Sequence, residues 1–203
     1  NKILILKQKL KDYDYIFTSD ADVILTNRDI RIEDIILRYS LNKFILGITT
    51  DYNSLNSGNI IWRNCYLSHQ LIKKTIELSN DKIRYSLKTP FIPKGIYEQP
   101  SLIYWINSNK KYQEKIKIIP QFEMNSYESI FPELRKPNII KSINKINNRC
   151  NWKEGDFLIH LAGFNYIIKN NFKINCQSII DKYQKIYYQL IKQKEGDDFG
   201  YIL

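Results

Sequence analysis

Residues 15–25 read Tyr-Ile-Phe-Thr-Ser-Asp-Ala-Asp-Val-Ile-Leu, and this stretch predicts the fold. Its aromatic and β-branched start is typical of a strand, and Asp20 and Asp22 follow with one residue between them. Alternate residues of an extended chain point to the same side, so we expect the two carboxylates to converge. Hard divalent cations prefer oxygen ligands, and ligands of α/β sheets bind at strand ends. The stretch therefore favours a metal site in an α/β domain, and the alternative is a solvated turn.

The segments around this stretch alternate between helix-like and strand-like patterns, which is typical of an α/β fold. Helices are predicted over residues 3–11, 32–41, 68–78, 100–106 and 179–191, and further strands over 44–49, 59–63, 116–120 and 157–161. Loops are predicted over 51–58 and 88–99, and a long surface excursion over 131–152.

The composition excludes several classes of protein. With 203 residues, of which 43% are hydrophobic, the chain is long enough for one globular domain and too apolar to be wholly disordered. Its apolar runs are far shorter than the ~20 residues of a membrane-spanning helix. The net charge is +10, but the basic residues are spread out, with no run longer than two. This spread favours a compositional bias over a nucleic-acid partner, although a nucleotide diphosphate would also suit a basic pocket.

Two short polar segments are candidate sugar-binding elements. The turn predicted at Asn56, Ser57 and Gly58 would bring backbone N–H groups and an amide near a sugar, and the alternative is a plain turn. Glu98 and Gln99 stand at a predicted helix start. They would either hydrogen-bond sugar hydroxyls or belong to the helix cap, with Glu98 near the positive end of the helix.

His160 lies in an apolar strand pattern late in the chain. An imidazole beside Asp20 and Asp22 would give a mixed nitrogen and oxygen ligand set, which suits Mn²⁺. The alternative is a core histidine with one hydrogen-bond partner.

Together and in this order, the polar segments resemble the galactosyl/mannosyl/xylosyl-transferases of glycosyltransferase family 34. The family pattern is a D-x-D after a strand, an N-[ST]-G before an apolar strand and R-N, an acidic-Gln pair, and a late G-D-F-x-x-H-x-x-G. Here the pattern reads Ser19-Asp20-Ala21-Asp22, Asn56-Ser57-Gly58 to Arg63-Asn64, Glu98-Gln99, and Gly155-Asp156-Phe157 to His160 and Gly163. The likeness runs from about residue 3 to about residue 166.

The resemblance implies a GT-A fold, a nucleotide-sugar-binding α/β domain whose mixed, mostly parallel sheet is flanked by helices. This chain would lack the first strand–helix unit of that fold. Residues 1–203 would then be a single, N-terminally truncated catalytic domain, with residues 167–203 as its C-terminal helical extension.

The resemblance also implies an activity: a retaining, metal-dependent transfer of a hexose or pentose from a nucleotide-diphosphate sugar to a glycan or glycoprotein. UDP-galactose or GDP-mannose would be the leading donors, and Mn²⁺ (or Mg²⁺) the cofactor. The implied metal ligands are Asp20, Asp22 and His160, the catalytic residues Gln99 and Glu98, and the nucleotide-sugar-binding residues Asp20, Asp22, Asn56, Ser57, Gly58, Gly163 and Asn165. The family tends to place a lysine where this chain has Asn165.

By the same resemblance we expect a Golgi membrane location, association with related transferases as a homo- or hetero-oligomer, and no nucleic acid. Two other functions stay open. One is a non-catalytic transferase-like subunit or binding protein. The other is a haloacid-dehalogenase-type phosphatase, since Asp20 to Val23 match its D-x-D-x-[TV] opening. That family also needs a later aspartate where this chain has His160.

Overall fold

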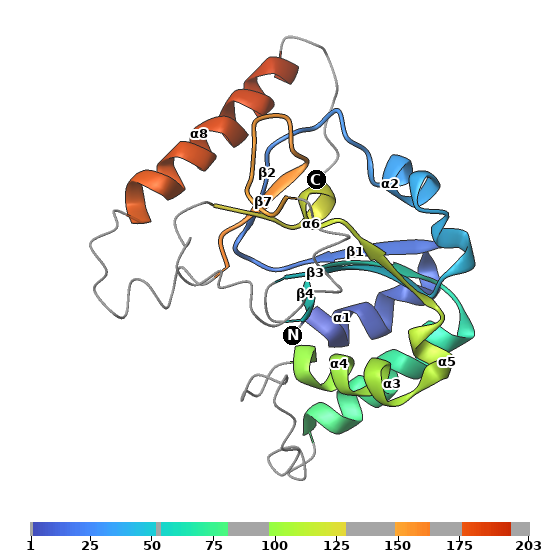
Figure 1. The fold of residues 1–203 in the computed structure, drawn as a ribbon. Helices are drawn as coiled ribbons and strands as arrows, with labels where there is room; N and C mark the ends of the chain where they lie inside the picture. The colour runs from blue at the N-terminus through green and yellow to red at the C-terminus, as the bar shows by residue number, and fades with distance from the viewer. Residues whose placement is uncertain (1, 52–53, 81–97, 129–148, 163–175, 196–203) are drawn as a thin grey trace.

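The computed structural model describes residues 2–51, 54–80, 98–128, 149–162 and 176–195 (Figure 1). The helices are α1 (Lys2–Lys9), α2 (Ile32–Arg38), α3 (Tyr66–Asn80), α4 (Glu98–Ser108), α5 (Lys110–Gln113), α6 (Gln121–Met124) and α8 (Cys176–Glu195). The strands are β1 (Tyr15–Ser19), β2 (Val23–Leu25), β3 (Leu46–Thr50), β4 (Leu55–Arg63), β5 (Ile116–Ile119), β6 (Ser126–Tyr127) and β7 (Leu158–His160).

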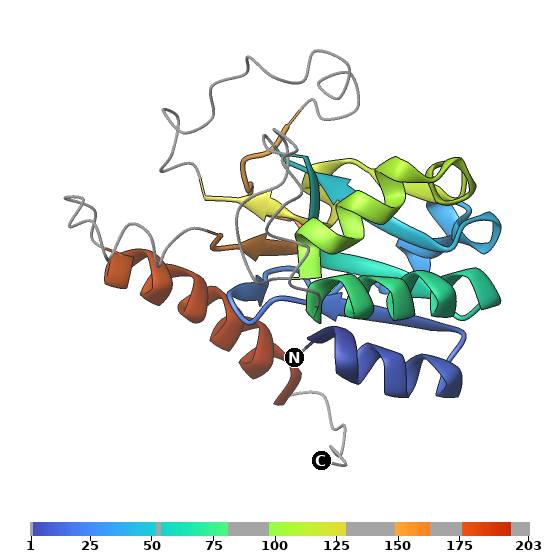
Figure 2. The ribbon, with the colours of Figure 1, turned by 90° about the horizontal axis from the view of Figure 1, so that it is seen from below.

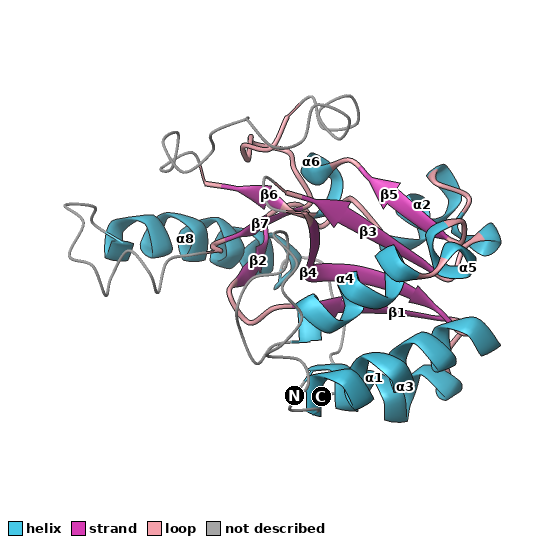
Figure 3. Ribbon diagram, turned by 60° about the horizontal axis from the view of Figure 1, so that its bottom comes forward, coloured by secondary structure: helices cyan, strands magenta, loops and turns pink. Residues whose placement is uncertain are grey.

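The strands form two sheets, ordered β1-β4-β3-β5 and β2-β7-β6 (Figure 3). Both are mixed, as expected, but the expected majority of parallel strands is not found among the described residues. There β1–β4, β3–β4 and β2–β7 are antiparallel, and only β3–β5 and β6–β7 are parallel. In the larger sheet, β4 returns after a short connection from β3 and therefore runs antiparallel to it, and β4 is also antiparallel to its other neighbour, β1.

The larger sheet is covered on both faces. Side chains alternate along β4, so Ile60 and Trp62 pack with α1, α3 and α4, while Ile61 packs with Ile35 of α2 and Met124 of α6. Figure 1 shows α1, α3 and α4 on one side of the sheet and α2 and α6 on the other. Burying both faces stabilises β1 and β4, which carry the polar site at their ends.

A bulge in β4 corrects one prediction. Ile48 pairs with Ile60, but the next residue, Thr49, pairs with Asn56, so residues 57–59 are extra on β4. Asn56, Ser57 and Gly58 therefore lie inside β4 and not in a turn, and the strand predicted over 59–63 begins at Leu55. Small polar residues and glycine are common to turns and bulges, so composition alone did not separate the two.

The remaining predicted elements agree with the described helices and strands to within a few residues, while β2, α5, α6 and β6 were not predicted. α8 lies beside the smaller sheet (Figure 2), and its Tyr183 packs with Ile159 of β7 and with Leu161, which follows that strand. Most of the predicted loop 88–99 and of the excursion 131–152 lies outside the described residues. Among the helices described, none combines the length and apolarity needed to cross a bilayer.

Candidate functional site

The structure brings the three predicted metal ligands together. One ligand atom from each of Asp20, Asp22 and His160 lies within 4.8 Å of the other two. His160 Nε2 is 3.2 Å from Asp22 Oδ1 and 3.9 Å from Asp20 Oδ2. The histidine side chain is 4% exposed, whereas the aspartate side chains are 40% and 47% exposed. The group is thus anchored in the protein on the imidazole side and open to solvent on the carboxylate side.

Backbone hydrogen bonds place both carboxylates where the two sheets meet. The Asp20 N–H donates to the Gly58 carbonyl over 2.8 Å, which ties the end of β1 to the bulge. The Leu161 N–H donates to the Asp22 carbonyl over 2.9 Å, and Val23 pairs with His160. Asp20 and Asp22 therefore lie in the short connection between β1 and β2. His160 comes from β7, the strand paired with β2.

The donor set fits a divalent cation. It consists of two carboxylates and an imidazole, a combination of oxygen and nitrogen donors that suits Mn²⁺. The hydrogen bond with His160 lowers the pKa of Asp22, outweighing burial, which acts in the opposite direction. Asp22 therefore stays ionised at neutral pH and below, as a metal ligand must.

Lys2, in the first turn of α1, joins the site although the sequence analysis did not single it out. Its Nζ is 2.5 Å from Asp20 Oδ1, 2.7 Å from the Ser57 carbonyl oxygen and 3.4 Å from Glu98 Oε1. Its ammonium thus links the Asp20 carboxylate to the start of α4. In the sequence it looks like any helical lysine, because its partners lie far along the chain.

Glu98 and Gln99 lie at the same place, as residues of α4 and not of a loop. Glu98 faces Lys2, and Gln99 Oε1 accepts hydrogen bonds from the Ser57 N–H (2.9 Å) and the Ser57 hydroxyl (3.1 Å). Since a backbone N–H only donates, the carbonyl oxygen of Gln99 must face Ser57. The β4 bulge and α4 are therefore locked together next to Asp20.

Asn56 and Gly58 face inward. The Asn56 side chain is 6% exposed, and its Nδ2 donates to Asp51 Oδ2 (2.8 Å) and to the Tyr127 hydroxyl (2.9 Å). Its Oδ1 accepts from the Gly58 N–H over 2.8 Å. A Cβ on Gly58 would lie 2.4 Å from His160 Cε1, so glycine is what lets the imidazole pack on β4. Asn56 thus supports the bulge from within the protein.

Asn125 is a further residue that the sequence analysis missed. Its Oδ1 lies 2.8 Å from His160 Nδ1 and 3.0 Å from Asn59 Nδ2, and it is fully buried. It precedes β6, a two-residue strand too short to produce a hydrophobic period. Gly163 and Asn165 lie outside the described residues.

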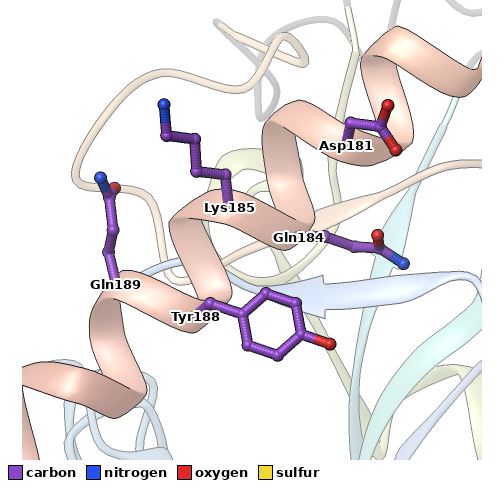
Figure 4. Close-up of a pocket in the computed structure, with 5 residues that line it drawn as sticks. All are labelled: Asp181, Gln184, Lys185, Tyr188 and Gln189. Atoms are coloured by element: carbon purple, nitrogen blue, oxygen red, sulfur yellow. The ribbon is translucent and has the colours of Figure 1, made fainter.

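Two hollows lie away from this group. One, of about 280 Å³, is lined by Thr50, Ser54, Leu55, Ile106, Asn107, Gln113, Ile116 and Ile118. The other, of about 440 Å³, runs along α8 and is lined by Asp181, Gln184, Lys185, Tyr188 and Gln189 (Figure 4). Neither includes a residue of the Asp20–Asp22–His160 group.

Asp156, from the late polar motif, clamps the chain that leads into β7. Arg149 donates to both of its carboxylate oxygens over 2.6 Å, and Ser126 Oγ and the Lys153 N–H donate to Oδ2 over 2.9 Å.

We expect Asp156→Asn to lower the free energy of unfolding by about 2–4 kcal/mol, because Arg149 loses its counter-charge. Urea denaturation measures this. The control Glu154→Gln removes an exposed charge nearby and should change stability little. Equal stability of the two variants would contradict the clamp.

Comparison with known proteins agrees with this geometry. Residues 39–171, more than half of the chain, match the model of the galactosyl transferase GMA12/MNN10 family. An alpha-1,2-galactosyltransferase of Schizosaccharomyces pombe is 22% identical over 232 residues, covering 98% of this chain. The chain spans about half the length of that relative, 52%.

Two solved structures share the fold. A glycosyltransferase involved in glycosylation of the major capsid of PBCV-1 has a TM-score of 0.55 at 13% identity, with 83% of this chain and 71% of that chain covered. The galactosyltransferase LgtC, solved with donor and acceptor sugar analogues, has a TM-score of 0.54 at 11% identity, with 92% and 65% covered. The fold is therefore of the GT-A type, as expected. With a family match that runs through the bulge, α4 and His160, this chain belongs to the galactosyl transferase GMA12/MNN10 family.

Proposed function

We propose that this chain carries the catalytic site of a metal-dependent, retaining glycosyltransferase. Its donor would be a nucleotide-diphosphate sugar carrying a hexose or pentose, with UDP-galactose or GDP-mannose first, and its acceptor a glycan or glycoprotein. The observation that carries the proposal is the grouping of Asp20, Asp22 and His160 beside Lys2 and the start of α4. A purely structural group would have no need of three ligand atoms facing one point at an open edge.

The metal ligands and Lys2 would act on the leaving diphosphate. Mn²⁺ or Mg²⁺ bound by Asp20, Asp22 and His160 would act as a Lewis acid on the leaving diphosphate. Lys2 places a fixed positive charge at the same edge, in a chain that has Asn165 where the family tends to place a lysine. Preorganised charge of this kind stabilises a departing anion without reorganisation during the reaction.

Glu98 and Gln99 are the proposed catalytic residues that meet the sugar. They start α4 next to Ser57, so their polar groups are fixed relative to Asp20. In the same-face retaining reaction that we propose, the departing phosphate would take the proton of the acceptor, so these side chains would only orient the sugar and stabilise positive charge on it. Ser57 and the Gly58 backbone would lie beside the same sugar, with Gly163 and Asn165 near the diphosphate.

The wider setting is proposed from the family. It includes a Golgi membrane location, assembly with related transferases, and a single domain over residues 1–203 with a C-terminal helical extension from residue 167. The phosphatase alternative has little support, because Asp156, which begins the late half of its motif, is engaged by Arg149. A non-catalytic role remains as an outcome of the test below.

The test is a melting-temperature titration with Mn²⁺ and a panel of nucleotide sugars. We expect Mn²⁺ alone to raise the melting temperature, and one nucleotide sugar to raise it further only when Mn²⁺ is present, because ligands that bind the native state stabilise it. The control is the same panel without metal.

A variant sharpens the test. Lys2→Met should weaken the response to the nucleotide sugar more than the response to Mn²⁺, whereas Lys7→Met changes an exposed lysine of the same helix and should alter neither. A cooperatively melting chain that responds to no nucleotide sugar would contradict the proposed activity and favour the non-catalytic role.

A further inference from the structure

We propose that Asn125 is a positioning residue that fixes the tautomer and orientation of His160, so that Nε2 presents its lone pair to a metal ion. This inference rests on the proposed function, in which His160 is a metal ligand. A histidine ligand needs one unprotonated nitrogen, and the partner of the other nitrogen decides which one that is. Here that partner is Asn125, at 2.8 Å from Nδ1.

Two groups determine which partner donates in each hydrogen bond of the network: the Gly58 N–H, which only donates, and the Asp51 carboxylate, which accepts. The Gly58 N–H can only donate, so Asn56 turns its Oδ1 to Gly58 and its Nδ2 to Tyr127 and Asp51. The Asp51 carboxylate can only accept, so the Tyr127 hydroxyl gives its proton to Asp51 over 3.1 Å. The Tyr127 oxygen can then only accept from its other neighbours.

Asn125 contacts both Tyr127 and His160, so the role of Tyr127 as acceptor determines how the Asn125 amide is oriented toward His160. Because Tyr127 can only accept, the amide Nδ2 of Asn125 faces it, at 3.5 Å. The amide Oδ1 then faces His160 Nδ1 and Asn59 Nδ2, which donates to it over 3.0 Å. An amide oxygen offers no proton, so His160 Nδ1 must carry one. The proton that hydrogen-bonds Nε2 to Asp22 Oδ1, over 3.2 Å, is then the one that a metal ion displaces, and its loss leaves the lone pair on Nε2.

Packing holds the ring in this orientation. Gly58 lies against one side so closely that a Cβ would overlap the ring, and Tyr127 meets the ring edge-on with centroids 5.5 Å apart. The side chain is 4% exposed, so little space is left for the ring to turn.

The cost of the network also argues for a role beyond stability. Asn56, Asn59 and Asn125 are three buried amides in the core of one small domain, and Asn125 lies 66 residues from Asn59. Burying amides is unfavourable unless they are hydrogen-bonded, and apolar side chains would fill the same space at less cost. Setting the proton on one imidazole nitrogen is a task that apolar side chains do not perform.

The experiment uses ¹⁵N-labelled, metal-free protein across a pH series, with His69→Gln to remove the other histidine. Ring-nitrogen chemical shifts then report the tautomer directly. We expect the Nδ1–H form in the parent and its loss in Asn125→Leu. Asn125→Asp keeps an acceptor and should keep the Nδ1–H form.

Mn²⁺ affinity, measured by electron paramagnetic resonance, is the second readout. We expect Asn125→Leu to weaken it about 10–100-fold, in line with other outer-shell partners of metal ligands. Asn125→Asp should stay within a few-fold, and Asn107→Leu, an exposed amide on α4, should have no effect.

The two proposals fail differently. A parent ring that keeps its last proton on Nε2 and not on Nδ1 overturns the role of Asn125, and that measurement needs no metal and no substitution at Asn125. A loss of stability in Asn125→Leu with unchanged tautomer and Mn²⁺ affinity also overturns it, because Asn125 would then be only structural. A parent with the Nδ1–H ring that binds no divalent cation upholds the positioning and overturns the proposed function.

Discussion

Asp22→Asn should abolish Mn²⁺ binding and lower kcat/KM for sugar transfer by about a thousandfold, while the protein stays folded. The asparagine keeps the shape of the side chain but loses the charge that a divalent ion requires. Losing Lewis-acid stabilisation of the leaving group is expected to raise the barrier by about 4 kcal/mol, which corresponds to that factor.

The fold should tolerate this change because the structural contacts of Asp22 are made by its backbone. Its carbonyl accepts from the Leu161 N–H, and its side chain is 47% exposed. The measurements are the release of nucleoside diphosphate with time and the melting temperature without metal. Asp12→Asn, at an exposed aspartate before β1, is the matched control. Turnover within tenfold of the parent in Asp22→Asn would show that Asp22 is no metal ligand.

The sequence predicted the ligand triad because each ligand stands in a strong local pattern. Asp20 and Asp22 directly follow an aromatic and β-branched strand, and His160 lies within an apolar strand pattern, so each stands out locally as a candidate. The resemblance to the transferase family then joined segments 140 residues apart, which local patterns cannot do. The structure brings the three side chains together, with one N or O atom of each within 4.8 Å of the other two.

The residues that support the triad were not predictable in the same way. Lys2 meets Asp20 18 residues away, and Asn125 meets His160 35 residues away. Neither contact leaves a local pattern, because each depends on how elements distant in sequence pack together. The turn predicted at Asn56–Gly58 is part of a strand with a bulge for a related reason: the backbone there is shaped by the pairing of β4 with both β1 and β3.

Gly58→Ala tests the packing of β4 against His160, and we expect it to weaken Mn²⁺ binding at least tenfold. The added Cβ would lie 2.4 Å from His160 Cε1 and 2.8 Å from His160 Nδ1. Both distances are shorter than a non-bonded contact of a Cβ atom allows. The strand cannot withdraw easily, because the Gly58 carbonyl accepts from the Asp20 N–H. The ring must therefore move away from Asn125 or from Asp22. Overpacking of this kind also costs about 1–3 kcal/mol of stability.

Gly47→Ala separates the loss of binding from the loss of stability. Gly47 lies in β3 of the same sheet, where a Cβ would meet the side chains of Ile119 and Leu41 at 2.7 and 3.0 Å, away from the ligands. Both variants should therefore unfold at lower urea concentration than the parent, but only Gly58→Ala should lose Mn²⁺ affinity in a direct titration. If the two variants bound Mn²⁺ equally well, the imidazole would not rest on Gly58, and the arrangement that aims Nε2 at Asp22 would be wrong. A loss of Mn²⁺ affinity in Gly58→Ala but not in Gly47→Ala would instead show that metal binding depends on the absence of a side chain at Gly58, where the imidazole packs.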